Sequence, residues 1–183
     1  MTYFPSLPED AGVRHALGLN PEAGRLLIGY HTAVLRSPSP LTEGERELIA
    51  AYVSGLNACG YCHGVHSTTA RAFGIDEKLL ETLVDDPELA AAPEKLRAIL
   101  RFARKLTLNQ TRVSQADASA VFAAGWDERA LHDAINVVCL FSFMNRLVHG
   151  HGITGDPTIW AERGEALKES GYDPMLAMLP PTA

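Results

Sequence analysis

Two cysteines and two histidines lie close together in the run CGYCHGVH, which spans residues 59–66. Residues three or four apart share a helix face, so Cys59, Cys62 and His66 would point the same way on a helix. A C-x-x-C pair can close a disulfide, and either thiol can resolve a sulfenic acid formed on the other. An imidazole one turn further on can take the thiol proton or hold the thiolate by charge. The run predicts a dithiol redox site that could attack a peroxide O–O bond or a disulfide.

A carboxylate upstream of the cysteines could complete a proton relay. Glu47 lies near the apolar face of a predicted helix that starts at the T-x-x-E capping box of residues 42–45. A second helix is predicted over about residues 59–73, and the free N–H groups at its start favour a thiolate at Cys59. If the two helices pack antiparallel, a partly buried Glu47 needs a partner, and His66 is the natural one. The alternative is a solvated Glu47, which is common for glutamates on helices.

Helical spacing of apolar residues recurs along the whole chain, and no segment shows sustained strand alternation with hairpin turns. We expect a single all-α domain over residues 1–183, with residues 42–74 as its core motif. The predicted helices span about residues 9–18, 21–36, 42–58, 59–73, 76–84, 94–108, 114–124 and 127–149, with one more after residue 158.

The longest predicted helix, over about residues 127–149, is apolar nearly all round in its middle. A helix of that kind is buried on more than one side, and the second side could be a subunit interface. We expect the third cysteine, Cys139, to be buried there as a small hydrophobic residue. Arg146 in the same run needs an interface or a carboxylate, and a structural ion pair is the simpler expectation. His149 and His151 could line a pocket or lie at a frayed helix end.

The composition excludes several classes of protein. Of the 183 residues, 46% are hydrophobic and 21% are charged, which is ordinary for a soluble globular domain. A net charge of -6 argues against a nucleic-acid partner. We find no apolar run long enough for a membrane span and no secretory signal at the start of the chain. We expect a cytoplasmic protein, in which a close cysteine pair is more often catalytic or metal-binding than a structural staple.

A metal site is the main alternative for these side chains. Four ligands could come from Cys59, Cys62, His63 and His66. However, Cys62 and His63 are adjacent and cannot both easily face one ion from a single helix, and zinc sites usually draw ligands from two separate segments. A purely structural cysteine pair is another alternative, because buried cysteines are common packing residues. We expect no bound metal or other cofactor.

The relay residues together form a pattern that resembles a known family. Glu47, Cys59, Cys62 and His66 give E-x11-C-x2-C-x3-H. This is similar to the signature of the alkylhydroperoxidase D (AhpD-like) family, in the carboxymuconolactone decarboxylase superfamily. The peroxidase-related branch has chains of this length and an Asn-Arg pair similar to residues 145–146 here. The resemblance implies an all-helical fold that forms dimers, trimers or hexamers, and cysteine-based peroxide reduction without haem, metal or flavin.

The resemblance also implies a role for each of the four residues. Cys62 would be the peroxidatic thiolate, and Cys59 would be the resolving cysteine. His66 would be the base that activates Cys62, with Glu47 behind it in the relay. The substrate would be a small alkyl hydroperoxide or hydrogen peroxide, and the electron donor an external dithiol or a protein.

The chain departs from some members of the family beside the second cysteine. Tyr61 stands where they carry a histidine, and the nearby extra imidazole, His63, follows the cysteine instead. We expect Tyr61 and His63 to form walls of the site. Three other functions stay open: a thiol–disulfide oxidoreductase with little peroxidase activity, a decarboxylase-like enzyme, and a non-catalytic metal-binding or scaffold protein.

Overall fold

The computed structural model describes residues 2–85, 88 and 92–181. These residues form helices joined by turns, with no strand among them, which confirms the all-α class. The α-helices are α1 (Val13–Gly18), α2 (Pro21–Arg36), α3 (Glu43–Leu56), α4 (Gly60–Ala72), α5 (Glu77–Leu83), α6 (Glu94–Leu108), α7 (Gln115–Ala123), α8 (Glu128–Gly150) and α9 (Trp160–Ser170). Short 3₁₀ helices are η1 (Gln110–Arg112), η2 (Pro157–Ile159) and η3 (Asp173–Met178).

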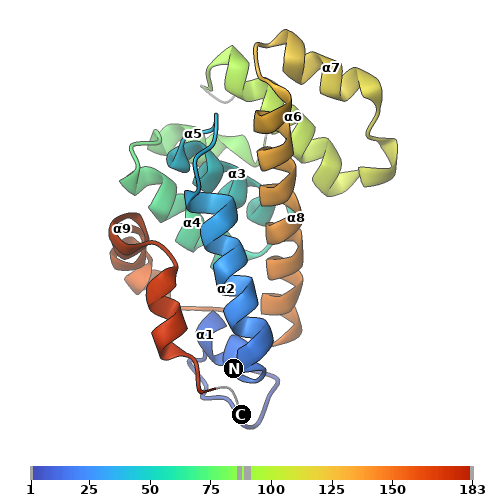
Figure 1. Ribbon diagram of the computed structural model, residues 1–183. Helices are drawn as coiled ribbons and strands as arrows, with labels where there is room; N and C mark the ends of the chain where they lie inside the picture. The colour runs from blue at the N-terminus through green and yellow to red at the C-terminus, as the bar shows by residue number, and fades with distance from the viewer. Residues whose placement is uncertain (1, 86–87, 89–91, 182–183) are drawn as a thin grey trace.

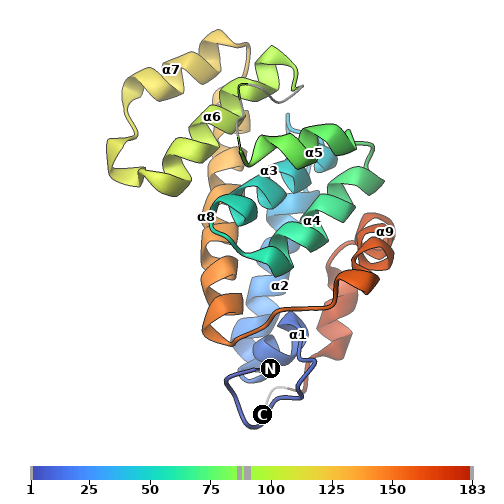
Figure 2. The same cartoon turned by 180° about the vertical axis from the view of Figure 1, so that it is seen from behind.

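Helices α2 and α8 run along the long axis of the molecule, and α3 and α4 pack across them (Figure 1). Helices α6 and α7 lie at the end away from the two chain termini, and α9 lies beside α4 (Figure 2). The core between these helices is made of fully buried aliphatic and aromatic side chains, such as Leu35, Leu48, Ile49 and Phe141. The functional side chains carried by α3 and α4 therefore project from a well-packed core.

The corner between α3 and α4 positions the cysteines. Helix α3 begins at the predicted capping box, where Thr42 Oγ1 accepts from the Glu45 backbone N–H at 3.1 Å. The chain leaves α3 and turns through Ala58, whose φ of 55° is left-handed. That conformation costs a residue with a Cβ about 1–2 kcal/mol. The turn makes Cys59 the N-cap residue of α4 and folds α4 back against α3.

Two glycines let α9 lie directly against α4. A Cβ at Gly64 would meet the ring of Trp160 at 2.1 Å, and a Cβ at Gly164 would meet the backbone of Thr68 at 2.7 Å. Neither contact is possible with a larger residue unless the helices move apart. The hydroxyl of Thr68 also donates to the carbonyl of Trp160 at 2.8 Å. This close packing brings the C-terminal segment to the side of α4 that carries Cys62.

Cys139 is exposed, so the expectation that it is buried was wrong. Helix α8 has an outer stripe with the spacing of one helix face, made of positions 132, 136, 139, 143 and 146. Phe143, one turn beyond Cys139, is 53% exposed. The apolar run in the sequence continues round the helix, but α2, α3 and α6 cover only part of its circumference.

Arg146 also differs from its expectation. Its Nη1 donates to the carbonyl of Ser142 at 2.5 Å, one turn earlier on α8, and the side chain is exposed. The expected ion pair is absent among the described residues. An arginine on the outer stripe is solvated and needs no carboxylate, because the cost of an unpaired charge arises only on burial.

Most helices lie within a few residues of their predicted bounds, including the longest, α8. The first helix begins later than expected, at Val13. The end of the chain forms η3 in addition to the one predicted helix, α9. Within residues 2–85, 88 and 92–181, no helix is long and apolar enough to cross a membrane.

Candidate active site

Glu47 lies wholly buried in a hydrogen-bonded cluster, with 0% of its surface exposed. Its Oε2 accepts from His66 Nδ1 at 2.6 Å, and its Oε1 accepts from the Tyr172 hydroxyl at 2.8 Å. The Arg36 guanidinium forms an ion pair with Oε1 at 2.6 Å. Burial alone would raise the pKa of Glu47, but His66 and Arg36 lower it below its usual value. The carboxylate is therefore ionised at neutral pH. His66 is the partner expected from the sequence, whereas Arg36 and Tyr172 were not expected.

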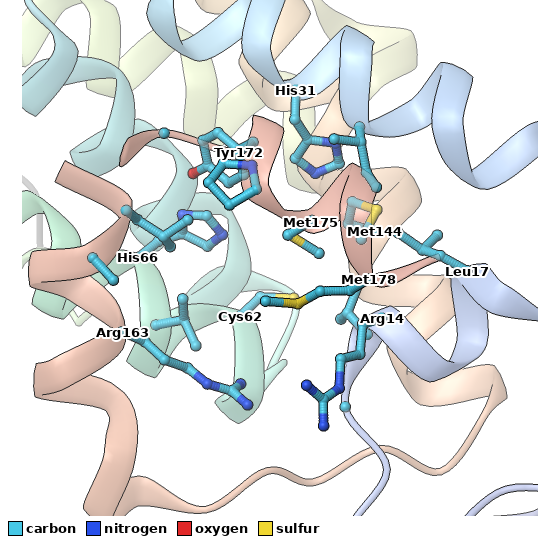
Figure 3. Close-up of a pocket in the computed structure, with 18 of the residues that line it drawn as sticks. Arg14, Leu17, His31, Cys62, His66, Met144, Arg163, Tyr172, Met175 and Met178 are labelled. Carbon is cyan, nitrogen blue, oxygen red and sulfur yellow. The ribbon is translucent and has the colours of Figure 1, made fainter. Parts of the chain in front are cut away.

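The bond to Glu47 fixes the proton on the His66 ring. An ionised carboxylate can only accept, so Nδ1 carries a hydrogen, and Nε2 is the ring nitrogen left to exchange a proton with another group. The Phe141 ring packs edge-on against the imidazole, with centroids 4.3 Å apart and an interplanar angle of 75°. His66 is held on two sides in this way. It lines the same cavity as Cys62, as Figure 3 shows, and offers that cavity a basic nitrogen.

The two motif cysteines are free thiols within hydrogen-bond reach of each other. Cys59 is 0% exposed, whereas Cys62 is 3% exposed and lines the cavity. The thiol of Cys62 donates a hydrogen bond to the sulfur of Cys59, which is the main reason that the pKa of Cys59 falls to about 6. The same bond, together with burial, raises the pKa of Cys62. The pair gives up one proton easily and holds the second tightly.

Asn145 of α8 is a polar neighbour of both thiols. It is buried, its Nδ2 donates to Ser54 Oγ at 3.0 Å, and its Oδ1 accepts from Asn57 Nδ2 at 3.0 Å. Its side chain also forms hydrogen bonds with Cys59 and Cys62, and each bond acts to lower the pKa of its thiol. The sequence offered two signals for this residue, its place in a mostly apolar stretch of the helix and the Asn-Arg pair of the family resemblance.

A cavity of about 360 Å³ opens beside Cys62 and His66. Residues from α1, α2, α4, α8, α9 and η3 line it, and most of them are apolar, including Leu17, Ile28, Phe141, Met144, Met175 and Met178. The two methionines of η3, Met175 and Met178, form part of its wall. Figure 3 shows this wall around the thiol and the imidazole. A molecule with an apolar body can therefore reach Cys62.

The structure separates the two predicted wall residues. Tyr61 lines the cavity, and its hydroxyl accepts from Arg163 Nη1 at 2.8 Å. His63 is not among the residues that line it, because its Nδ1 forms a hydrogen bond with the carbonyl of Ala51 on α3 at 2.9 Å. The wall role expected for His63 is therefore corrected, and its contact ties α4 to α3. Residues two apart on a helix point to different sides, which accounts for the difference.

A second histidine, His31 of α2, lines the cavity together with His66, although nothing in the sequence distinguished it. Its Nδ1 bonds to the carbonyl of Leu27 at 2.8 Å. Burial lowers the pKa of His31 to about 4, against the opposing effect of that carbonyl. The ring is neutral at pH 7, and because a carbonyl only accepts, its Nε2 is an acceptor. His149 and His151 do not line the cavity, and only the charge of His149 reaches the thiols, where it lowers the pKa of Cys59.

Comparison with known proteins supports the resemblance stated above. The carboxymuconolactone decarboxylase family matches residues 21–105. A solved structure titled alkylhydroperoxidase AhpD core, an uncharacterized peroxidase-related protein from Ralstonia eutropha JMP134, is 26% identical with a TM-score of 0.74, over 81% of this chain and 78% of that one. Over residues 21–105 and in its overall fold, the protein is thus similar to the AhpD-like proteins of the carboxymuconolactone decarboxylase superfamily.

Two other solved structures share the fold. An uncharacterized peroxidase-related protein from Silicibacter sp. TM1040 is 28% identical with a TM-score of 0.74, over 79% of this chain and 75% of that one. The debrominase Bmp8, solved with 2,3,4-tribromopyrrole, is 16% identical with a TM-score of 0.66, over 81% and 80% of the two chains, and the likeness is one of fold alone. No curated protein matches the sequence.

The candidate site combines a thiol pair, an imidazole and a buried carboxylate. Cys62 and His66 meet at the cavity, and Cys59 and Glu47 lie behind them. Across the described part of the chain, no group of three or more His, Cys, Asp or Glu side chains is arranged to hold a metal ion. The chemistry that these residues can carry is nucleophilic attack by a thiolate followed by disulfide formation.

Proposed function

We propose that the protein is a cysteine-based peroxidase that reduces a small alkyl hydroperoxide or hydrogen peroxide. The observation that carries this proposal is the arrangement at the cavity. Cys62 faces the cavity, a second thiol is hydrogen-bonded to it, and His66 is held by the buried Glu47. Peroxide reduction needs these parts, namely a reachable thiolate, a group that moves protons, and a thiol that resolves the sulfenic acid.

The catalytic cycle follows from these positions. The Cys62 thiolate attacks the outer oxygen of ROOH, the O–O bond breaks, and the alkoxide takes a proton from the His66 imidazolium to leave as ROH. Cys62 is then a sulfenic acid. The Cys59 thiolate attacks the sulfur of that acid, which forms the disulfide, and the hydroxide that leaves takes up a proton from solvent to become water. Two electrons from the thiol pair have reduced the peroxide, and an external dithiol or protein donor restores both thiols.

The shared proton of the pair determines which sulfur attacks. At neutral pH the pair carries one negative charge, placed on Cys59 by the hydrogen bond from Cys62. Transfer of that one proton from Cys62 to His66 Nε2 makes Cys62 a thiolate and gives the imidazolium that later protonates the alkoxide. Cys62 is the sulfur that a substrate in the cavity can reach, since Cys59 is fully buried. We therefore assign attack to Cys62 and resolution to Cys59.

A coupled assay with cumene hydroperoxide and a dithiol donor tests the proposal. Cys62→Ser should abolish turnover, because serine is not a nucleophile at neutral pH without a strong base. Cys139→Ser is the matched control, since this thiol is exposed on α8 away from the cavity, and it should leave turnover unchanged. Full activity in Cys62→Ser would refute the proposal.

A thiol–disulfide oxidoreductase is the second candidate. The lowered pKa of Cys59 favours it as well, because disulfide exchange also needs a thiolate. Stopped-flow mixing of the reduced protein with one equivalent of peroxide separates the two functions. Rapid loss of both thiols supports the peroxidase, whereas oxidation only by a disulfide substrate supports the second candidate. Decarboxylation does not require the thiol pair at all.

We also propose a cytoplasmic homo-oligomer that assembles through the outer faces of α2 and α8. Leu26, Tyr30 and Phe143 are large apolar residues exposed on these helices. The Tyr30 hydroxyl donates to Asn136 Oδ1 at 2.8 Å, which joins the two faces into one surface. The apolar character of this surface supports a dimer, trimer or hexamer.

A further inference from the structure

Two arginines lie at the exposed end of the cavity, beside Cys62. Arg14 of α1 is exposed and Arg163 of α9 is half-buried, and both line the cavity. Figure 3 shows the two guanidinium groups on either side of the thiol, at the end of the cavity opposite His31. Arg163 Nη2 lies 3.8 Å from the position of a Cβ at Gly12, two residues before Arg14. Two cations therefore flank the approach to the reactive sulfur.

These arginines are not neutralised at the cavity. No aspartate or glutamate is among the residues that line it, and across residues 2–85, 88 and 92–181 Arg14 has no hydrogen bond or ion pair. Arg163 donates to the hydroxyl of Tyr61. Asp156 feels the charge of Arg163, but its pKa is lowered first by hydrogen bonds from Thr158. The cavity entrance is therefore locally positive, although the chain as a whole has a net charge of -6.

Apart from the thiol pair and His66, the rest of the cavity lining carries no charged group. His31 at the inner end is neutral at pH 7, because burial lowers its pKa to about 4. Between the two ends lie apolar side chains, among them Leu17, Ile28 and Met144. The ligand that complements this cavity is apolar over most of its length and negatively charged at one end. Carboxylates suit guanidinium groups, which offer paired donors in a plane.

From this complementarity we infer that the site is selective for an organic hydroperoxide that also bears a carboxylate, held by Arg14 and Arg163 at the exposed end of the cavity. The hydroperoxide group of this ligand rests on the proposed peroxidase function. The binding of its carboxylate does not, and it can be measured without turnover. Neutral hydroperoxides and hydrogen peroxide lack the contact with the two arginines, so they are poorer substrates than the carboxylate-bearing hydroperoxide.

Calorimetric binding of two unreactive probes tests the carboxylate site. The probes are 4-isopropylbenzoate and its neutral amide, which share one apolar body. We expect the benzoate to bind about tenfold more tightly than the amide, as for one charge-assisted contact near a surface. The preference should shrink as the salt concentration rises. It should disappear in Arg14→Met/Arg163→Met and persist in Arg163→Lys, which keeps the charge.

Arg112→Met is the matched control, since Arg112 is exposed and does not line the cavity, and it should keep the full preference. Circular dichroism verifies that each variant is folded. Equal binding of the two probes to the wild-type protein would overturn the inference, and so would a preference that survives in the folded double variant. Because these measurements need no turnover, selective benzoate binding by a protein that reduces no peroxide would support the carboxylate site and refute the peroxidase.

Discussion

Replacing Glu47 with glutamine tests the relay on which the site depends. Glutamine has nearly the same shape but no charge, and its amide oxygen can accept from only some of the donors that surround the carboxylate. The Arg36 ion pair at 2.6 Å and the His66 bond at 2.6 Å both lose their charged partner. Removing one member of a buried pair typically costs about 3–5 kcal/mol. Since the free energy of unfolding of a domain is about 5–15 kcal/mol, the variant should be folded at 25 °C but much less stable than the wild type.

The activity of Glu47→Gln should fall for a separate reason. Without the carboxylate, the His66 ring loses the group that fixes its tautomer and stabilises its protonated form. General acid–base catalysis contributes about 10²–10⁴ in rate, so peroxide-driven thiol oxidation should slow by at least 10². Stopped-flow fluorescence measures this rate. Glu45→Gln is the control, because glutamine preserves the capping box at the start of the same helix.

The pH dependence of stability gives a second check on Glu47. Its pKa is lowered in the folded state, so it contributes stability above its usual pKa, and this contribution is lost as the pH falls through the lowered value. The stability gap between wild type and Glu47→Gln, measured by urea unfolding, should therefore be largest near neutral pH and shrink in acid. A folded Glu47→Gln that oxidises within about threefold of the wild-type rate would refute the relay.

Three further predictions concern the thiol pair, the corner before it and the outer surface. In a Cys139→Ser background, Cys62→Ala should raise the pKa of Cys59 from about 6 toward the value of an ordinary thiol, as read from thiolate absorbance. Cys62→Ser keeps a hydrogen-bond donor and should raise this pKa less. An unchanged pKa of Cys59 in Cys62→Ala would contradict the hydrogen bond between the two thiols. Ala58→Gly should stabilise the protein by about 1 kcal/mol in urea unfolding, because glycine adopts a φ of 55° without strain, and a loss of stability would disprove this. Phe143→Asp should lower the oligomer mass in light scattering, whereas Phe122→Asp, at an exposed position of α7, should leave it unchanged. An unchanged mass in Phe143→Asp would exclude the outer face of α8 as the interface.

The helices around the cysteines could be predicted from the sequence because their signals are local. The T-x-x-E capping box, the Asn20-Pro21 start of α2 and Gly74 after α4 each set an end through the residue's own backbone preferences. The pairing of Glu47 with His66 could be proposed from spacing and the cost of burying a charge. These features depend on one or two neighbouring helices only.

The remaining parts of the site depend on contacts between distant segments, which local patterns do not reveal. Tyr172 reaches Glu47 across 125 positions of the chain, and its η3 neighbours close the cavity. Cys139 was misplaced because an apolar run does not show which side of a helix its neighbours cover. His63 was misplaced because closeness to Cys62 in sequence was taken as closeness to the cavity.

Trapping the first oxidised sulfur tests the central claim most directly. The reduced protein is treated with one equivalent of cumene hydroperoxide in the presence of dimedone, and the peptides are analysed by mass spectrometry. Wild type should form the Cys59–Cys62 disulfide, and Cys59→Ser should carry dimedone on Cys62. A dimedone adduct on Cys59 in Cys62→Ser, with none on Cys62 in Cys59→Ser, would contradict the assignment of the attacking thiol. Failure of peroxide to oxidise either residue would contradict the peroxidase itself.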